Sequence, residues 1–129
     1  MKLNILPPAL IVYTDALPDD VGGRATGPIV RIKPKYQCDE GIHKHELAHV
    51  EMWWLTLGLI WIAELLFKRV RLWNEARAYR VQMEYQDCDS HYMTLDDAAG
   101  RLASAHYGFA ITLDQAKAML EPEYQDGMD

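Results

Sequence analysis

The stretch EGIHKHELAHVEMWWL, residues 40–55, decides how this chain folds. Asp39 stands just before it and is a typical N-cap, so the sequence predicts a helix that begins at residue 40 and ends near residue 57. Inside the stretch, His45 and His49 are four positions apart. Positions four apart lie one turn apart on the same helix face, so the two imidazoles are predicted to point the same way.

The residue types at this spacing predict a metal site. Two imidazoles on one helix face can bind one zinc ion at N–Zn distances of about 2.0–2.1 Å. Glu46, next to the first histidine, is predicted to be the catalytic base: zinc lowers the pKa of its bound water toward about 7, and the carboxylate takes the proton of that water. The HExxH pattern therefore predicts zinc as the cofactor and a hydrolase that attacks a carbonyl group. Surface histidines without a metal are the alternative.

The chain before this helix is predicted to be extended. Residues 9–13, ALIVY, are rich in β-branched and aromatic types, and residues 29–33, IVRIK, alternate apolar and basic side chains. The glycines between these two segments predict turns. Pro34 directly follows the second segment and places it at a sheet edge.

The chain after residue 57 is predicted to be helical. Gly58 should break the first helix, and a short helix over residues 59–67 should follow, then a longer one over residues 70–87. Thr94 and Thr112 each precede an acidic first turn, so each is predicted to cap a further helix. We predict that Gly108 stops the first of these two helices.

These elements predict an α+β fold in one domain, residues 1–129. Strands and turns occupy residues 1–38, metal-binding helices residues 40–88, and a C-terminal helical hairpin residues 94–120. The fold is expected to be mostly helical, with a small N-terminal antiparallel sheet packed on the HExxH helix. The length of 129 residues and the half-hydrophobic composition agree with one globular core.

The charge and the apolar runs limit the partners. The net charge of −6 argues against nucleic acid as a partner. The most apolar run, residues 52–63, is shorter than the ~20 residues that a transmembrane helix needs, so no transmembrane span is predicted. A buried helix and turn is expected for this run, and interfacial membrane contact through Trp53, Trp54 and Trp61 is the alternative. The N-terminus has no signal-peptide pattern, and we expect a cytoplasmic protein. A peptide or protein substrate is expected, and the oligomeric state stays open.

The segment from residue 29 to residue 85 resembles the zincin metallopeptidases, in particular the thermolysin-type gluzincin branch. IVRIKPKY followed by HELAH matches the strand and the HExxH helix of that group, over less than half of the chain. The resemblance implies that His45 and His49 are zinc ligands and that Glu46 is the base. It also implies a third ligand from a glutamate on a later helix, for which Glu75 in LWNEARAYR is the match. The chain looks like a minimal version of such a domain, as in small bacterial or phage proteins.

Other residues compete for roles at this site. Glu64 and His91 are the alternatives to Glu75 as third ligand. Glu75 could instead be a solvated helix residue or pair with Arg71 or Arg77. Tyr79 lies one turn after Glu75 and is a candidate catalytic residue that donates to the oxyanion, although core packing is its alternative role. The remaining candidates for substrate contact are His91 and His106, and His43 is predicted to point away from the metal.

Three further predictions concern the cysteines and the class of function. Antiparallel packing of the first and third helices would bring Cys88 near Cys38, but a reducing cytosol predicts two free thiols. A non-catalytic zinc-stabilised interaction module is the alternative to the hydrolase. A DNA-binding helix-turn-helix over residues 94–120 is disfavoured because acidic residues outnumber basic ones there.

Overall fold

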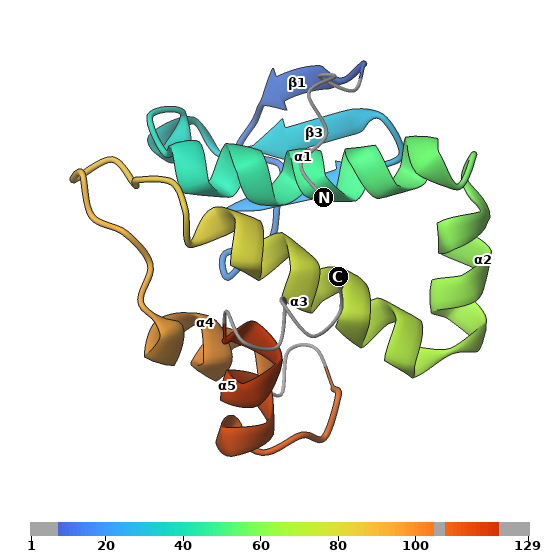
Figure 1. Ribbon diagram of the computed structural model, residues 1–129. Helices are drawn as coiled ribbons and strands as arrows, with labels where there is room; N and C mark the ends of the chain where they lie inside the picture. The colour runs from blue at the N-terminus through green and yellow to red at the C-terminus, as the bar shows by residue number, and fades with distance from the viewer. Residues whose placement is uncertain (1–7, 105–107, 122–129) are drawn as a thin grey trace.

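The computed structural model describes residues 8–104 and 108–121 of the chain. Over these residues the chain forms three strands and five α-helices, with one 3-10 turn at Pro34–Tyr36, so the predicted α+β class is confirmed. Figure 1 shows successive layers: the sheet, then α1, then α3, and then the pair formed by α4 and α5. The helix α2 stands at one end and joins α1 to α3.

The sheet contains β1 (Leu10–Tyr13), β2 (Gly23–Thr26) and β3 (Ile29–Ile32) in the order β1-β3-β2. β1 pairs with β3 in parallel and β2 pairs with β3 antiparallel, so the predicted antiparallel sheet is in fact mixed. The β2–β3 hairpin places β3 between the other two strands. The prediction of β3 as an edge strand is therefore wrong. Pro34 lies beyond Ile32, the last paired residue, so its missing N–H does not interrupt the ladder.

β2 occupies a segment that was predicted to be turns. A Cβ added at Gly23 would lie 3.1 Å from the side chain of Ile42 and 3.4 Å from the side chain of Glu46, both on α1. The glycine thus lets β2 lie directly against the helix that carries the HExxH pattern. Its low strand propensity is also the reason that the sequence did not indicate a strand here.

The helix α1 spans Glu40–Leu55, and its cap is the predicted one: the Asp39 side chain accepts a hydrogen bond of 2.9 Å from the Ile42 N–H. It ends before residue 57 because Leu57 and Gly58 take positive φ angles of 51° and 85°. The short helix α2, Leu59–Leu66, then leaves at an angle of 105° to α1. Within the described ranges, no single helix is long and apolar enough to cross a membrane.

The helix α3 spans Lys68–Gln82 and runs back along α1 in the opposite direction. It ends five residues before the predicted limit at residue 87. At the predicted limit the chain turns instead, because the side chain of Asp87 accepts hydrogen bonds from the N–H groups of Asp89 and His91. The side chain of Asp87 is thus committed to this turn.

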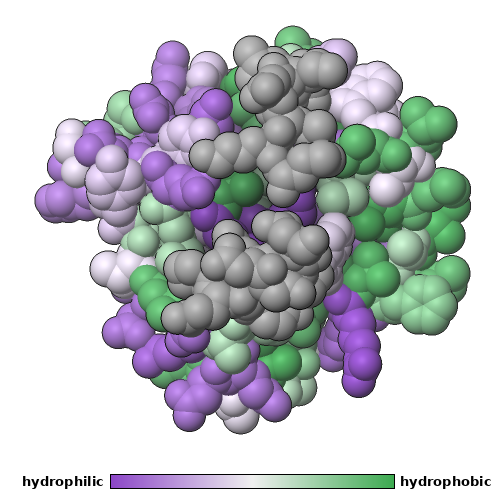
Figure 2. Space-filling view, in the orientation of Figure 1, coloured by the Kyte–Doolittle hydropathy of each residue, from purple (hydrophilic) through white to green (hydrophobic). Residues whose placement is uncertain are grey.

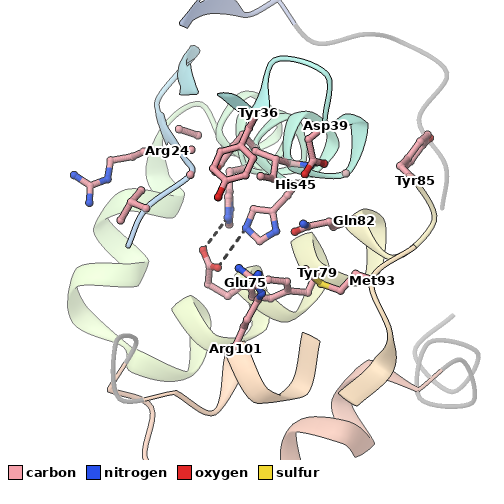
Figure 3. Close-up of a pocket in the computed structure, with 18 of the residues that line it drawn as sticks. Arg24, Tyr36, Asp39, His45, Glu75, Tyr79, Gln82, Tyr85, Met93 and Arg101 are labelled. Carbon is pink, nitrogen blue, oxygen red and sulfur yellow. Dashed lines mark hydrogen bonds and ion pairs between the residues drawn. The ribbon is translucent and has the colours of Figure 1, made fainter. Parts of the chain in front are cut away.

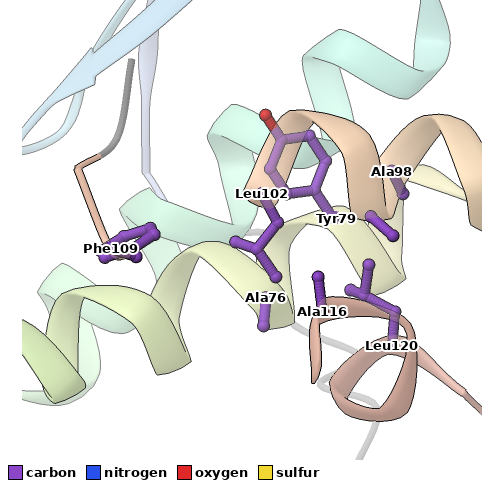
Figure 4. Close-up of a cluster of buried hydrophobic side chains, with 8 residues drawn as sticks. Ala76, Tyr79, Ala98, Leu102, Phe109, Ala116 and Leu120 are labelled. Atoms are coloured by element: carbon purple, nitrogen blue, oxygen red, sulfur yellow. The ribbon is translucent and has the colours of Figure 1, made fainter. Parts of the chain in front are cut away.

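The last two helices are α4 (Leu95–Leu102) and α5 (Leu113–Leu120). Both predicted caps are present: Thr94 accepts from the Asp97 N–H, and Thr112 forms a capping box with Gln115. α4 ends at Leu102, well before Gly108, so the glycine does not stop that helix as predicted. Figure 4 shows the core that these helices share with α3, where Tyr79 lies among small and aliphatic side chains.

A second, smaller core joins the sheet to α1. Val30 and Ile32 of β3 are fully buried against Val50 of α1. One core lies between the sheet and α1, and the other lies between α3 and the pair formed by α4 and α5. The two cores thus enclose α1 and α3 from opposite sides. This packing determines which side chains of α1 and α3 face each other.

Cys38 and Cys88 form a disulfide, with their Cα atoms 5.1 Å apart. The antiparallel packing that brings them together was predicted, but the expectation of two free thiols was wrong. That expectation came from the assumed reducing compartment rather than from geometry, and the cytoplasmic location itself stays a prediction. The bond ties the loop before α1 to the loop after α3.

We expect that replacing both cysteines with serine lowers the free energy of unfolding by about 2–4 kcal/mol, because the bond closes a long loop in the unfolded chain. The two cysteines are separated by 50 positions. Urea denaturation of the oxidised protein and of the Cys38→Ser/Cys88→Ser variant would measure the difference. Equal urea midpoints, or two titratable thiols in the native protein, would contradict the expectation.

Candidate metal centre

Three predicted ligands converge where α1 and α3 face each other. His45 projects from α1 toward Glu75 on α3 (Figure 3), and His49, one turn further along α1, meets the same carboxylate. The Nε2 atom of His49 lies 2.8 Å from Oε1 of Glu75, and the Nε2 atom of His45 lies 3.5 Å from Oε2. One potential ligand atom from each of the three residues lies within 4.8 Å of the others. They are the only such group of histidine, cysteine and carboxylate side chains over residues 8–104 and 108–121.

The rings are held by contacts with one another and with the core. The rings of His45 and His49 lie edge to face, with centroids 5.1 Å apart. Tyr79, one turn beyond Glu75 on α3, packs edge-on against His45 at a centroid distance of 4.5 Å. Since Tyr79 is also part of the helical core, the core limits the orientations that His45 can adopt.

The donor set fits a zinc ion. Two imidazoles and one carboxylate, with a side open to solvent, are the ligands of a common class of zinc hydrolase. Oε2 of Glu75 is buried, and no hydrogen-bond partner for it occurs among the described residues. Nε2 of His45 lies 3.5 Å from it, so a cation between the three side chains would give that oxygen a closer partner.

The charges at the site are strongly coupled. Burial alone would lower the pKa of His49, but the charge and the hydrogen bond of Glu75 outweigh burial and raise it to about 9. Burial likewise opposes ionisation of Glu75, yet the two histidines hold its pKa well below the usual range. His49 and Glu75 are therefore an ion pair at neutral pH.

Zinc is expected to displace about one proton from the chelator-treated protein at pH 7, because zinc needs the neutral imidazole of His49. With a pKa of about 9, that imidazole is protonated at pH 7. The proton competes with the metal below this pKa, so zinc affinity should rise about tenfold for each pH unit up to about pH 9. Titration calorimetry in buffers of different ionisation enthalpy would count the protons. Release of no proton at pH 7 would contradict this ion pair.

The three residues line a cleft of about 1240 Å³. One wall is β2, and the others come from α1, α2, α3, α4 and the segment that leads into α4. Glu46 lies in this cleft beside the two histidines and is only 6% exposed. Burial raises the pKa of its carboxyl group, while the neighbouring His45 and His49 oppose the rise. The predicted base therefore shares one cleft with the predicted ligands.

The competing ligand candidates lie outside the three-residue group. Glu64 lines the same cleft but accepts a hydrogen bond of 2.7 Å from Nδ2 of Asn74. His91 also lines the cleft and is exposed. The arginines that were considered as partners of Glu75 have other contacts: Arg77 pairs with Glu51, and Arg71 lies over the Phe109 ring.

The remaining histidines have separate surroundings. His43 lies within hydrogen-bond distance of the Tyr13 hydroxyl at 2.9 Å and of the Asp39 carbonyl at 2.7 Å, away from the cleft as predicted. His106 lies outside the described residues. His43 therefore does not contribute to the site.

Two cleft residues were not found from the sequence. Arg24 on β2 and Arg101 on α4 both line the cleft (Figure 3). Arg24 was hidden because its strand was read as turns, and Arg101 because nothing local indicates that α4 faces the metal centre. Both residues add positive charge to a cleft that acidic side chains also line. They would attract negatively charged groups of a substrate.

Comparisons with protein-family models, with curated proteins and with solved structures gave no match to this chain.

Proposed function

We propose that the chain is a zinc-dependent hydrolase of peptide bonds, built as a minimal gluzincin-like domain. The observation that carries the proposal is the convergence of His45, His49 and Glu75 in a cleft that also holds Glu46. The order of a strand, the HExxH helix and a later glutamate-bearing helix supports the same resemblance.

The proposed chemistry follows from the residues in the cleft. His45, His49 and Glu75 would hold the zinc ion, which when bound polarises a carbonyl group and lowers the pKa of a water molecule. The Glu46 carboxylate takes a proton from the attacking water as the new C–O bond forms. Glu46 then gives that proton to the amide nitrogen as the C–N bond breaks.

Tyr79 has two candidate roles in this scheme. Its ring packs against His45, and this contact supports a positioning role for the metal ligand. Donation of its hydroxyl to the oxyanion remains the second proposed role, since Tyr79 also lines the cleft. The variant Tyr79→Phe would keep the ring contact with His45 and remove only the hydroxyl. A loss of activity in this variant would therefore indicate the role in oxyanion donation.

β2 is the proposed substrate-binding strand. It is an edge strand of the sheet and lines the cleft next to Glu46. An extended peptide could add to such an edge through backbone hydrogen bonds and place one of its carbonyls at the metal. Substrate side chains on alternate positions would then face the cleft.

The test combines metal analysis with cleavage of a peptide library. We expect the purified protein to bind one zinc ion, to cleave at least one peptide, to lose cleavage after chelation and to regain it with zinc. The readouts are elemental mass spectrometry and mass spectrometry of the peptides. Stoichiometric zinc without any cleavage would instead favour the non-catalytic zinc-stabilised module, and a protein that binds no zinc would contradict both.

A further inference from the structure

The end of the molecule formed by α2 exposes an unusual amount of apolar surface. Nine of the fifteen large hydrophobic side chains that are exposed in the described ranges fall within residues 54–67. The exposed fractions reach 81% for Leu57, 86% for Leu65 and 70% for Leu66. We call the exposed apolar side chains of residues 54–67 the α2 surface. Figure 2 shows hydrophobic residues gathering on the side where α2 lies in Figure 1.

The protein's own core does not account for these side chains. Within α2, the sequence LIWIAELL buries only Ile60. A helix this apolar is normally covered on most of its faces, by protein or by lipid. The 105° bend between α1 and α2 sets α2 across the end of the molecule, where a flat partner can reach it.

The charges around the α2 surface indicate which partner covers it. Residues 52–63 contain no charged side chain, and the exposed Lys68 and Arg69 follow at the end of α2. The nearest acid, Glu64, is part of the cleft and accepts the hydrogen bond from Asn74. In a chain with a net charge of −6, this border is locally positive. An apolar face with a cationic border complements lipid chains beneath anionic headgroups.

Two tryptophans support the same partner. Trp54 and Trp61 on this surface are partly exposed, at 38% and 46%. Partly buried indoles are enriched where a protein meets the headgroup level of a bilayer. In a symmetric contact with a second copy, by contrast, Lys68 and Arg69 of both copies would lie at the same border. Residues 52–73 contain no exposed acid that could pair with these four cations.

We propose that the α2 surface binds the interface of a bilayer that contains anionic lipids. α2 lies in the plane of the interface, and Lys68 and Arg69 contact the headgroups. Because Ile60 and Trp61 also line the cleft, binding holds the cleft close to the membrane surface. The proposal does not depend on the peptidase activity.

Flotation of the zinc-loaded full chain with vesicles tests the proposal. Vesicles of phosphatidylcholine with phosphatidylglycerol should bind the protein and shift its tryptophan fluorescence to shorter wavelength. Vesicles of phosphatidylcholine alone should bind it much more weakly. The Leu65→Glu variant should lose at least about tenfold in affinity, because it replaces the most exposed apolar side chain with a charge. Lys68→Gln and Arg69→Gln should each cost about fivefold, and only with the anionic vesicles.

Leu113→Glu is the matched control. Leu113 is 46% exposed at the start of α5, away from α2, and an acid in the first turn suits a helix N-terminus. Circular dichroism of each variant checks that it folds. Failure of the wild-type chain to float with anionic vesicles would overturn the proposal, as would equal binding of Leu65→Glu. Self-association that Leu65→Glu abolishes, without vesicle binding, would assign the surface to a second copy instead.

Discussion

Glu46→Gln is expected to keep zinc and to lower kcat by about 10²–10⁴-fold, the usual contribution of a general base. The amide has the size of the carboxylate but cannot accept the proton of the attacking water. Glu46 is not one of the three clustered ligands, so the zinc content should stay at one ion for each chain. Zinc analysis together with steady-state kinetics on a peptide cleaved by the wild type would measure both quantities.

Two features make this variant a clean test. Glu46 is buried against β2, and burial raises the pKa of its carboxyl group, so the neutral amide should not destabilise the fold. Glu84→Gln is the matched control, because Glu84 is exposed and does not line the cleft. We expect this control to retain wild-type kcat. Full activity of Glu46→Gln would exclude the proposed mechanism even if zinc is bound.

The parts of the fold that follow from local signals could be predicted from the sequence. The caps at Asp39, Thr94 and Thr112 each depend on one side chain and the next turn, and all three are present. The position of His45 and His49 on one face of α1 follows from helical periodicity alone. The candidate ligand Glu75 was found by resemblance, and its approach to the two histidines requires only that α3 fold back on α1.

The parts that depend on contacts between distant segments could not be predicted. β2 is a four-residue strand that begins with a glycine, and it exists because it pairs with β3 and packs on α1. The central place of β3 depends on both neighbouring strands, whereas the sequence offered only the adjacent proline. Predicting the disulfide required knowledge of the redox compartment as well as of the helix packing. Arg101 reaches the cleft only through the packing of α4, which no local pattern encodes.

Glu75→Ala is expected to weaken zinc binding by about 10²–10³-fold. Structural zinc sites bind with about 10–16 kcal/mol, so the loss of one of four coordinating groups removes about 2.5–4 kcal/mol. The variant should lose cleavage at zinc concentrations that saturate the wild type. Competition with a chromogenic chelator would measure the affinity. Excess zinc should restore part of the activity if the fold is intact.

Glu64→Gln is the comparison that decides which carboxylate is the third ligand. Glutamine can still accept the hydrogen bond from Asn74, so the change removes the charge and leaves that contact. Glu75 lies against both imidazoles, whereas Glu64 is outside the three-residue group. We therefore expect Glu64→Gln to bind zinc within about threefold of the wild type, since a charge in the same cleft acts only at a distance. A loss of about 10²–10³-fold in Glu64→Gln, with little change in Glu75→Ala, would reverse the assignment. The zinc ion would then lie closer to α2, which carries Glu64.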